Sequence, residues 1–388
     1  MPGENQPFQP TNRHIPRRAI VMSLAGLTGV SAVGGGLFWL ISSHKPQASP
    51  SSFHPRVISS PTPSPISTPV FKTLGPPLLT YHDPSNDVIE AVGWSSDGRH
   101  IASTGANTDL TVQVWDASTG NIVLTHPGSW TLAWSPNGKL IASAYSRYDA
   151  TLQTEVDVRA EVWDASTGNT VSIYSGHSDD INVGSIAWSP DGKRIASIGW
   201  IKEHTVQVWD VATGKNIFIY RGHSWIVGQV SWSPDSKHIA SVGTNGDFTV
   251  RVWDANTGID VLVFPGHRVT WSPDGGYIAS VAISDNTIQI WDINSKANVY
   301  TYNGHTDSVY NLAWSPDGKR IASASSKYDN NLKKTVDVVV QVWDVPSMNH
   351  IYLYHGHTDY VTALTWSLDS KYIASSSWDR TVQVWLAS

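Results

Sequence analysis

The chain has 388 residues, of which 15% are charged, 19 are Trp and none is Cys. The lack of Cys excludes a disulfide scaffold, a thiolate zinc site, a thiol nucleophile and a lipidated cysteine. The formal net charge of −6 is uneven: residues 1–77 carry six basic side chains and one acid, which leaves 20 basic and 31 acidic groups for residues 78–388. This acidic main body argues against nucleic acid as a partner, because binding to nucleic acid depends on neutralising phosphates with Lys and Arg.

Residues 19–41 form one uncharged, mostly apolar run that follows a basic segment, residues 1–18. A helix of this length, at about 1.5 Å per residue, can cross a hydrocarbon core of about 30 Å. Arg13, Arg17 and Arg18 flank the run on its N-terminal side, which places residues 1–18 in the cytoplasm by the positive-inside rule. We therefore expect a single-pass transmembrane helix or signal anchor over 19–41, with the rest of the chain outside the cell.

Two alternatives to a retained anchor stay open. Arg17-Arg18 with the apolar residues after it resembles a twin-arginine export signal, and Pro46-Gln47-Ala48 is a weak small-x-small cleavage site. Cleavage there would release an exported protein. The third interpretation is a buried soluble helix, which has nothing to pack against outside the repeats described below.

Residues 42–77 are rich in Pro, Ser and Thr. Proline removes backbone donors and fixes φ, and the apolar content is too low to offset the loss of chain entropy on folding. We expect this segment to be a disordered, extended linker that separates the main domain, residues 78–388, from a surface.

Two tryptophan landmarks recur seven times in residues 78–388, at spacings of about 38–54 residues. In the first, Trp-Ser precedes a turn, at Trp94, Trp134, Trp188, Trp232, Trp271, Trp314 and Trp366. In the second, Val or Ile precedes Trp, at Trp115, Trp163, Trp209, Trp253, Trp291, Trp343 and Trp385. Segments such as TVQVW alternate with period two and are β-branched, so each unit is predicted to contain four short strands. Such small sheets bury both faces only when they pack radially against one another.

The repeated pattern GH…WSPDG…IAS…VWD resembles that of the WD-repeat β-propellers, over about 310 of the 388 residues. The resemblance implies an all-β ring of seven four-stranded blades. That family closes its ring with a strand from the opposite terminus, and this chain ends just after a third strand, at Trp385. Because residues 78–82 resemble an outer strand, residues 351–355, we predict that they complete the last blade and cover its exposed edge.

His, Ser and acidic residues also recur, so a hydrolase triad has to be considered. Seven identical active sites in one ring are implausible, and the resemblance instead implies a structural network from the Trp ring nitrogen through Ser and His to an acid. A buried hydrogen bond contributes about 1 kcal/mol, and an orphaned polar group costs about 1–3 kcal/mol. The residues assigned in this way are His177, Ser197, Glu203 and Trp209; His223, Ser241, Asp247 and Trp253; His305, Ser323, Asp337 and Trp343; and His357, Ser375, Asp379 and Trp385.

Three units depart from the pattern and should have incomplete networks. The first has Pro84 where His is expected, the second has His126 at a shifted position, and in the fifth His267 lies only four residues before Trp271.

Two turns between second and third strands are enlarged, at 142–158 and 322–338, and share an S-[RK]-Y-D-x-x-L core. They belong to the second and sixth units, so we expect two projecting hairpins nearly opposite each other on one rim. Aromatic and Arg side chains supply most interface hot spots. The predicted partner-binding residues are Arg147, Tyr148, Leu152, Lys327, Tyr328 and Leu332 on the hairpins, joined by Trp130, Trp200, Trp225, Tyr310, Tyr360 and Trp378 on the rim. The opposing interpretation is that the insertions bind nothing and the aromatic residues only cover the blade tops.

The sequence predicts no catalytic residue, cofactor or metal site. Glu90, Glu155, Glu161 and His204 break the repeat, but at different radii and without metal-ligand spacing. We therefore expect a non-catalytic scaffold that presents a protein- or peptide-binding face outside the cell. The alternatives are a carbohydrate- or cell-wall-binding propeller, in which rim aromatics stack on sugars, and a propeller enzyme.

Overall fold

Every regular element in the described part of the chain is a β-strand. The computed structural model describes residues 72–387 apart from 86, 106–109, 150, 153, 178–181, 200–202, 346 and 348–349. The helix expected over 19–41 and residues 42–71 of the expected linker lie outside these residues.

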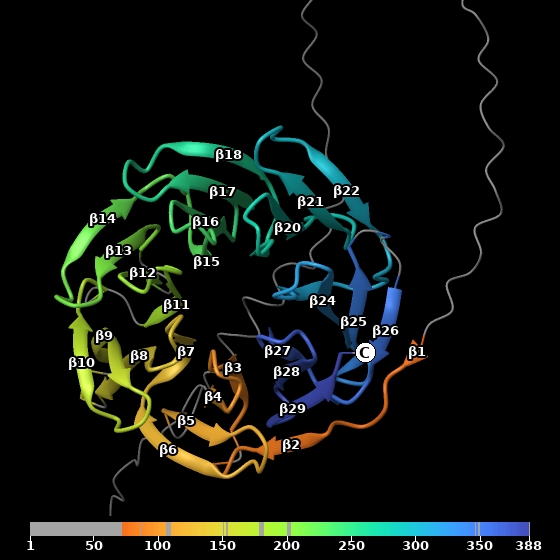
Figure 1. Cartoon of the computed structure of the whole chain (residues 1–388), viewed down its shortest axis with the longest axis horizontal. Helices are drawn as coiled ribbons and strands as arrows, with labels where there is room; N and C mark the ends of the chain where they lie inside the picture. The colour runs from red at the N-terminus through yellow and green to blue at the C-terminus, as the bar shows by residue number, and fades with distance from the viewer. Residues whose placement is uncertain are drawn as a thin grey trace, which may run out of the picture. The chain divides into compact units, whose positions relative to one another are not determined.

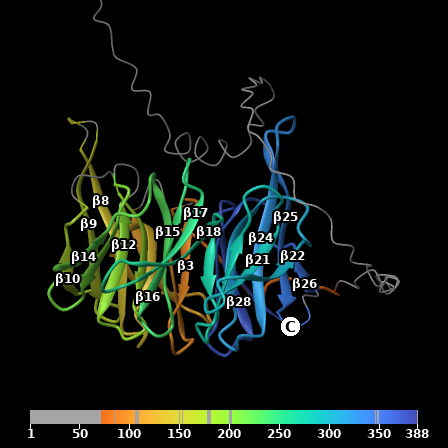
Figure 2. The same cartoon turned by 90° about the horizontal axis from the view of Figure 1, so that it is seen from above.

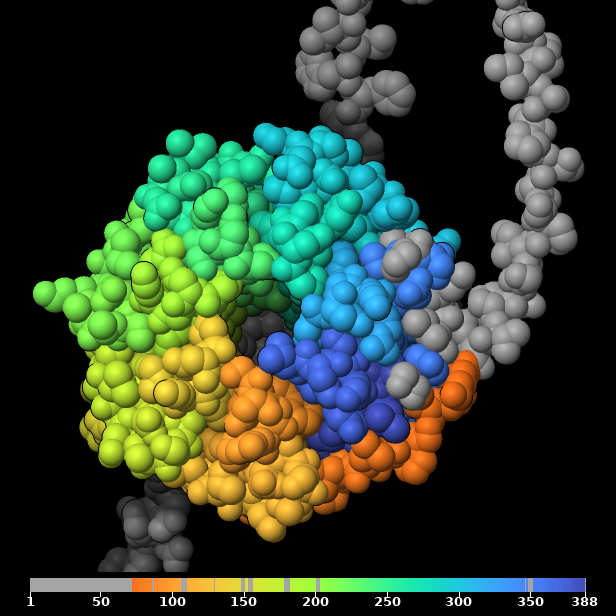
Figure 3. Space-filling model, in the orientation of Figure 1, coloured from red at the N-terminus to blue at the C-terminus, as the bar shows by residue number. Residues whose placement is uncertain are grey.

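The strands form seven sheets, each with four antiparallel strands and one of them with a fifth strand added at its edge, arranged radially around a central opening (Figure 1). The space-filling view shows that the ring is hollowed at its centre (Figure 3). In blades 1–6 the four strands follow one another from the inside of the ring to the outside. The expected all-β, seven-bladed propeller with four-stranded blades is thereby confirmed.

The blades divide the strands in chain order. Blades 1 to 3 contain β3 (Ile89–Trp94), β4 (His100–Gly105), β5 (Thr111–Asp116), β6 (Ile122–Pro127); β7 (Ser129–Trp134), β8 (Leu140–Asp149), β9 (Thr154–Asp164), β10 (Thr170–Tyr174); and β11 (Val183–Trp188), β12 (Arg194–Gly199), β13 (Val206–Asp210), β14 (Asn216–Tyr220). Blades 4 and 5 contain β15 (Val227–Trp232), β16 (His238–Gly243), β17 (Thr249–Asp254), β18 (Asp260–Pro265); and β19 (Val269–Trp271), β20 (Tyr277–Val281), β21 (Ile288–Asp292), β22 (Asn298–Tyr302). Blades 6 and 7 contain β23 (Val309–Trp314), β24 (Arg320–Asp329), β25 (Lys334–Asp344), β26 (His350–Tyr354), preceded in the chain by β1 (Lys72–Thr73); and β27 (Val361–Trp366), β28 (Tyr372–Ser377), β29 (Thr381–Leu386), joined by β2 (Leu79–His82).

Side-chain hydrogen bonds fix the turns between these strands. In the Trp-Ser turn of blade 1, Ser95 Oγ donates to Asp97 Oδ1 (2.6 Å) and accepts from the His100 backbone N (3.0 Å). The turn ends at Gly98, whose φ of 69° favours glycine. After the third strand, Asp116 Oδ1 accepts from the backbone N of Thr119 (2.8 Å). These turns set the length and register of each strand pair.

The hydrophobic core lies between adjacent sheets rather than within any one of them. One cluster joins Val162 and Tyr174 of blade 2 to Ile186, Trp188 and Trp209 of blade 3, and the other blade junctions repeat this arrangement. Full burial of such a side chain stabilises the fold by about 1.5–3 kcal/mol. Each blade therefore depends on its neighbours.

The closing strand lies where the sequence predicts. β2 pairs antiparallel with β29, with Leu79 opposite Val384 and His82 opposite Thr381. Tyr81 is buried and packs with residues of blades 7 and 1, which seals the junction between the last blade and the first.

The end of the expected linker is ordered, contrary to the expectation. β1 pairs in parallel with β26, with Lys72 opposite Tyr352, and gives blade 6 a fifth strand. Leu74 N donates to Leu353 O (2.8 Å), and the Leu74 side chain packs on the core of blades 6 and 7. The outer edge of blade 6 offers unpaired backbone groups, which accounts for the pairing.

Candidate functional site

Three blades contain the complete polar network. In blade 3, Trp209 Nε1 donates to Ser197 Oγ (3.0 Å), and His177 lies 2.8 Å from both Ser197 Oγ and Glu203 Oε2. All of these groups are buried or half-buried. The same contacts, at 2.8–3.2 Å, join His223, Ser241, Asp247 and Trp253 in blade 4, and His357, Ser375, Asp379 and Trp385 in blade 7.

Blade 6 uses a different partner for its histidine. His305 Nε2 is 2.6 Å from Ser323 Oγ, but its Nδ1 is 2.9 Å from Ser325 Oγ, not from the expected Asp337. Asp337 is exposed and has a φ of 54°, at the register shift of the long β24–β25 hairpin. The longer hairpin moves this carboxylate out of the core. Burial without a charged partner lowers the pKa of His305 to about 3.

The network is incomplete in blade 5, as expected. Trp291 Nε1 and Ser280 Oγ are buried and have no hydrogen-bond partner. His267 belongs to a shorter entry segment, where its backbone N donates to Val281 O (3.1 Å). Burial lowers the pKa of His267 to about 4.

A second feature of the blades was not anticipated: each outer strand supplies an aromatic ring that stacks on the third-strand Trp of the next blade. Tyr220 stacks on Trp253 at 4.2 Å between centroids, and His126 stacks on Trp163 at the same distance. His126 therefore occupies the stacking position and is not a displaced network histidine. The other pairs are Tyr81–Trp115, Tyr174–Trp209, Phe264–Trp291, Tyr302–Trp343 and Tyr354–Trp385. The signal available in the sequence was the aromatic residue or histidine that is last or next to last in each outer strand.

The enlarged turns of blades 2 and 6 are long hairpins that rise beyond the other strands on one rim (Figure 2). Between blades 2 and 6 lie three blades on one side of the ring and two on the other, so the hairpins stand nearly opposite each other (Figure 1). Both contain the same bulge, at Asp157 (φ 57°) and Asp337 (φ 54°), where the strand register shifts. An extra residue at such a bulge increases twist and redirects the strand.

The hairpin tips present apolar side chains to solvent. Leu152 is 65% exposed, Leu332 is 60% exposed and Tyr328 is 47% exposed. Arg147 and Lys327 are also exposed, and Tyr148 lies in β8 opposite Glu155. Exposed apolar residues beside basic groups are typical of interaction surfaces.

Arg159 stiffens the base of the blade 2 hairpin. Its guanidinium lies 3.9 Å from the centroid of the Tyr145 ring, pairs with Asp157, and donates from Nε to Glu161 Oε1 (2.7 Å). Glu161, which breaks the repeat, is thus a buried ion-pair partner in this strand.

Three of the predicted rim aromatics gather into one cluster, which we call the rim cluster: Tyr310, Tyr360, Trp378, Glu90 and Arg268. The Tyr360 ring is 4.5 Å from Tyr310 and 5.2 Å from Trp378. Trp378 Nε1 donates to Glu90 Oε1 (3.0 Å), and Arg268 Nε donates to Tyr310 O (2.5 Å). The cluster therefore joins blades 5, 6, 7 and 1.

Glu90 has the most perturbed carboxyl of the rim cluster. Removal from water raises its pKa from 4.5 to about 7, and the nearby Asp87 adds to the increase, while the bond from Trp378 opposes it. Glu90 breaks the repeat, which was the signal in the sequence. Its contact with Trp378 was not predicted.

The remaining predicted residues lie elsewhere. Trp225 is 47% exposed and stacks with His204 at 5.5 Å, on the entry segment of blade 4. Trp130 is half-buried in β7 with a φ of 64°, and Trp200 lies outside the described residues. The structure thus gathers three of the six predicted rim aromatics into the rim cluster.

Sequence comparison agrees with this geometry. The family model "WD domain, G-beta repeat" matches seven stretches of the chain, residues 75–116, 120–153, 168–210, 214–254, 258–292, 296–333 and 348–385. The chain belongs to the WD40-repeat family.

The similarity of this WD40 protein to individual proteins is confined to short segments. It is 33% identical over 81 residues to one of the subunits of chromatin assembly factor 1 from Mus musculus, which is 21% of this chain and 12% of that protein. It is 28% identical over 92 residues to protein HIRA of Dictyostelium discoideum, 21% of this chain and 7% of that protein. It is 36% identical over 84 residues to the target of rapamycin complex subunit wat1 of Schizosaccharomyces pombe, 21% and 23% of the two chains.

The described residues contain neither a metal-binding cluster nor a membrane-spanning helix. Among the described residues, no group of three or more His, Asp or Glu side chains is placed to hold a metal ion. Nor does the described part of the chain contain a helix of the length and apolarity needed to cross a bilayer.

Proposed function

We propose that the chain is a non-catalytic interaction platform whose partner, a protein or peptide, binds the rim that carries the two long hairpins. The observation that carries this proposal is the pair of equivalent hairpins, with Leu152, Tyr328 and Leu332 exposed at their tips. Exposed apolar side chains cost free energy in an isolated protein, and burial of such groups at an interface recovers it. Most of the rim cluster lies on blades 6, 7 and 1, at the shorter arc between the hairpins, and its half-buried aromatic side chains belong to the same rim.

The relatives support a protein partner over other classes. The names of two of them describe subunits, of chromatin assembly factor 1 and of a target of rapamycin complex, which are assemblies of proteins. We propose that this chain likewise acts through association. A glycan partner is the alternative outcome, because Trp225 and Tyr328 are exposed aromatic residues.

We propose further that residues 19–41 tether the propeller to the cell membrane, with the propeller outside the cell. The support is the uncharged run and the three arginines that precede it. Protease added to intact cells should degrade the propeller of the membrane-bound, full-length chain. A propeller that stays protected would contradict this orientation, and one released to the medium would indicate cleavage of the segment.

The hairpin hypothesis is tested by shortening both hairpins. Residues 145–157 and 325–337 are each replaced by the blade 4 turn, residues 243–247, which occupies the equivalent positions. Partner capture by the tagged full-length chain is then compared by quantitative mass spectrometry. We expect the wild type to retain specific proteins that the shortened variant loses by at least about tenfold, or about 1.4 kcal/mol.

A matched control keeps both hairpins at full length and replaces Ile217 and Ile219, exposed on the outer strand β14, with Thr. This control should capture the same proteins as the wild type. If the shortened variant captures the same proteins as the wild type, the hairpins are not the binding surface. If the shortened variant loses binding to a glycan array but keeps its protein partners, the rim binds sugars.

A further inference from the structure

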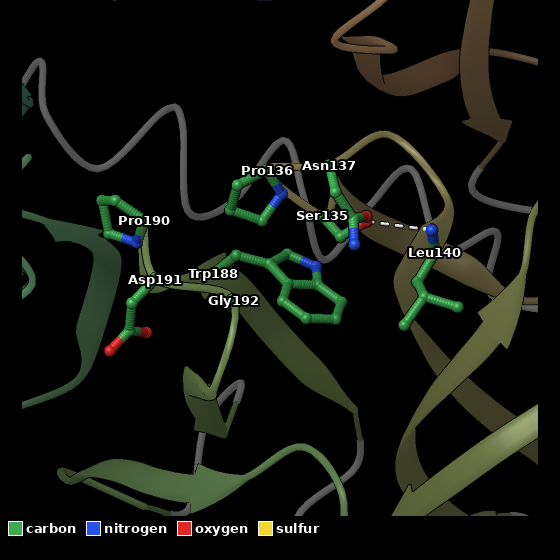
Figure 4. A pocket seen from close by; sticks show the side chains of 8 residues that line it. All are labelled: Ser135, Pro136, Asn137, Leu140, Trp188, Pro190, Asp191 and Gly192. Carbon is green, nitrogen blue, oxygen red and sulfur yellow. Dashed lines mark hydrogen bonds between the residues drawn. The ribbon is translucent and has the colours of Figure 1, made fainter.

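A cavity of about 260 Å³ lies between blades 2 and 3. The Trp-Ser turns of the two blades, residues 135–137 and 190–192, line it together with Leu140 and Trp188 (Figure 4). Leu140 is the first residue of β8, and the long hairpin begins at the other end of that strand. The cavity is therefore on the rim opposite to the hairpins.

At two other junctions the chain fills the equivalent place with its own arginine. Arg194, the first residue of β12, lies with Cζ 4.7 Å from the centroid of the Trp232 ring of blade 4. Arg320, the first residue of β24, lies 5.0 Å from Trp366 of blade 7. A guanidinium over an indole at these distances is a cation–π contact.

The two arginines also use the same backbone acceptor. Arg194 NH2 donates to Ser236 O (2.7 Å), and Arg320 NH2 donates to Ser370 O (2.6 Å). Each acceptor ends the Trp-Ser turn of the following blade. The residue at this position in blade 3 is Gly192, which lines the cavity.

The tryptophan at the cavity is held in the same way as the two that carry an arginine. Trp188 Nε1 donates to Ala133 O (3.0 Å), and the corresponding bonds of Trp232 and Trp366 are 3.1 and 3.0 Å long. The strand register is also the same, since Leu140 is opposite Asp164 as Arg194 is opposite Asp210. The indole is thus in position, but Leu140 provides no guanidinium.

Two sequence differences distinguish this junction from the two that an arginine fills. Leu140 is the one aliphatic residue at a position that is otherwise Arg, His or Tyr in the seven blades. Gly192, like the glycine at this position in four other blades, has no hydroxyl, whereas Ser236 and Ser370 accept from the backbone N of Asp191 (3.1 Å) and Asp317 (3.0 Å) of the preceding blade. A Cβ on Gly192 would meet only Pro136, at 4.0 Å.

Asp191 is the one acidic residue among those that line the cavity. Its exposed carboxylate points away from Trp188 (Figure 4) but adds negative charge beside the cavity, and it accepts from Ser189 Oγ (2.6 Å) and the Lys193 backbone N (3.0 Å). These bonds lower the pKa of Asp191 against the opposing effect of partial burial, so the group is ionised at neutral pH.

We propose that the cavity between blades 2 and 3 binds an arginine side chain of a partner protein, with the guanidinium over Trp188 and bonded to the Gly192 carbonyl. Arginine is favoured over lysine because its planar guanidinium stacks on an indole while its N–H groups reach an acceptor in the same plane. This site is on the opposite rim from the hairpins. Its failure would leave the function proposed above unaffected, and failure of that function would leave this site unaffected.

The probe is the peptide acetyl-Gly-Arg-Gly-amide, and its control is the citrulline peptide of the same shape without charge. Binding is followed by fluorine NMR of the full chain labelled with fluorotryptophan, in which the Trp188 resonance is assigned by its loss in Trp188→Phe. We expect the Arg peptide to shift this resonance at millimolar concentration, and the citrulline peptide to bind about tenfold more weakly.

The decisive variant is Leu140→Arg with Gly192→Ser, which recreates the filled junctions of Arg194 and Arg320. We expect it to move the Trp188 resonance without any peptide and to abolish the shift on peptide addition. If this variant does not fold, Asp191→Asn should weaken Arg binding and leave citrulline binding unchanged. An equal response to both peptides, or no shift up to about 10 mM, overturns the proposal. So does a Trp188 shift on removal of residues 1–71, because the chain's own arginines would then be the occupant.

Discussion

Two serines in equivalent positions, Ser241 and Ser280, differ in what surrounds them. Both are fully buried at the same place in the second strand. Ser241 Oγ contacts His223 Nε2 (2.8 Å) and accepts from Trp253 Nε1 (3.1 Å), whereas Ser280 Oγ has no partner. The repeat therefore keeps a serine in blade 5 although the network that uses it is absent.

This pair gives a matched test of the network. Ser241→Ala orphans a buried indole N–H and an imidazole nitrogen, so we expect it to lower the free energy of unfolding by about 2–3 kcal/mol. Ser280→Ala removes the same atom without breaking a bond and should change stability by less than about 0.5 kcal/mol. Denaturant midpoints of the two variants provide the comparison, and equal effects would show that the polar chain contributes nothing to stability.

Glu90 should make stability depend on pH near neutrality. Its pKa rises from 4.5 in the unfolded chain to about 7 in the rim cluster, so the folded state binds the proton more tightly. The stabilisation from this group is complete below pH 4.5 and is lost as pH rises through 7. Glu90→Gln keeps an acceptor for Trp378 but cannot ionise.

We expect Glu90→Gln to be more stable than the wild type by about 2 kcal/mol at pH 8 and nearly equal to it at pH 4.5. The figure is below the full value of the shift because Glu90 retains some contact with solvent. Thermal melts at the two pH values measure it. A difference that stays constant between pH 4.5 and 8 would mean that Glu90 is not desolvated.

For single residues, the sequence predicts the regular Trp–Ser–His–acid networks but not the places where a network changes partners. The acids of blades 3, 4 and 7 follow from their spacing to Trp209, Trp253 and Trp385. The same spacing is misleading for Asp337, because a bulge is a property of two paired strands and cannot be counted along one. The Glu90–Trp378 contact joins residues 288 positions apart and depends on ring closure.

The long hairpin of blade 6 changes the surroundings, and with them the pKa, of the buried His305. In blade 6 the long turn carries Asp337 away and leaves Ser325 beside His305. In blade 4 the short turn places Asp247 Oδ2 3.0 Å from His223 Nδ1. The length of the turn thus determines whether the buried histidine has a charged partner.

Replacing residues 325–337 with residues 243–247 restores an acid to blade 6. An opposite charge this close favours the protonated imidazole, so the pKa of His305 should rise from about 3 by roughly one to three pH units. NMR titration of the His305 ring measures it, with His223 as the internal reference. An unchanged His305 titration would show that hairpin length does not govern this site.

The elements themselves were largely predictable, since their turn chemistry and period-two alternation repeat seven times. The two hairpins and the closing strand were placed correctly from repeat length and from similarity between units. β1 was not predicted, because Lys72 and Thr73 carry no strand pattern and pair only with an edge that the folded blade 6 supplies.

For the whole molecule, closure of the ring depends on a strand that comes from the other end of the domain. β2 adds Tyr81 and Leu79 to the core between blades 7 and 1 and covers the edge of β29. Without it that edge exposes unpaired backbone groups, which favours self-association. β1, by contrast, contributes two exposed residues to an already complete blade.

Three truncations separate these contributions: removal of residues 1–71, 1–77 and 1–83. We expect the first two to melt within about 2 °C of each other, because residues 72–77 contribute only a two-residue edge strand and one half-buried apolar side chain, Leu74. Removal of 1–83 should cost at least about 4 kcal/mol, lower the melting temperature by roughly 8 °C or more, and produce oligomers in size-exclusion chromatography. If only the chain without residues 1–83 is insoluble, that also agrees with the expectation. The chain without residues 1–77 differs from it by only six residues, 78–83. A monomer that melts like the other two would mean that the blades hold the ring together without the closing strand.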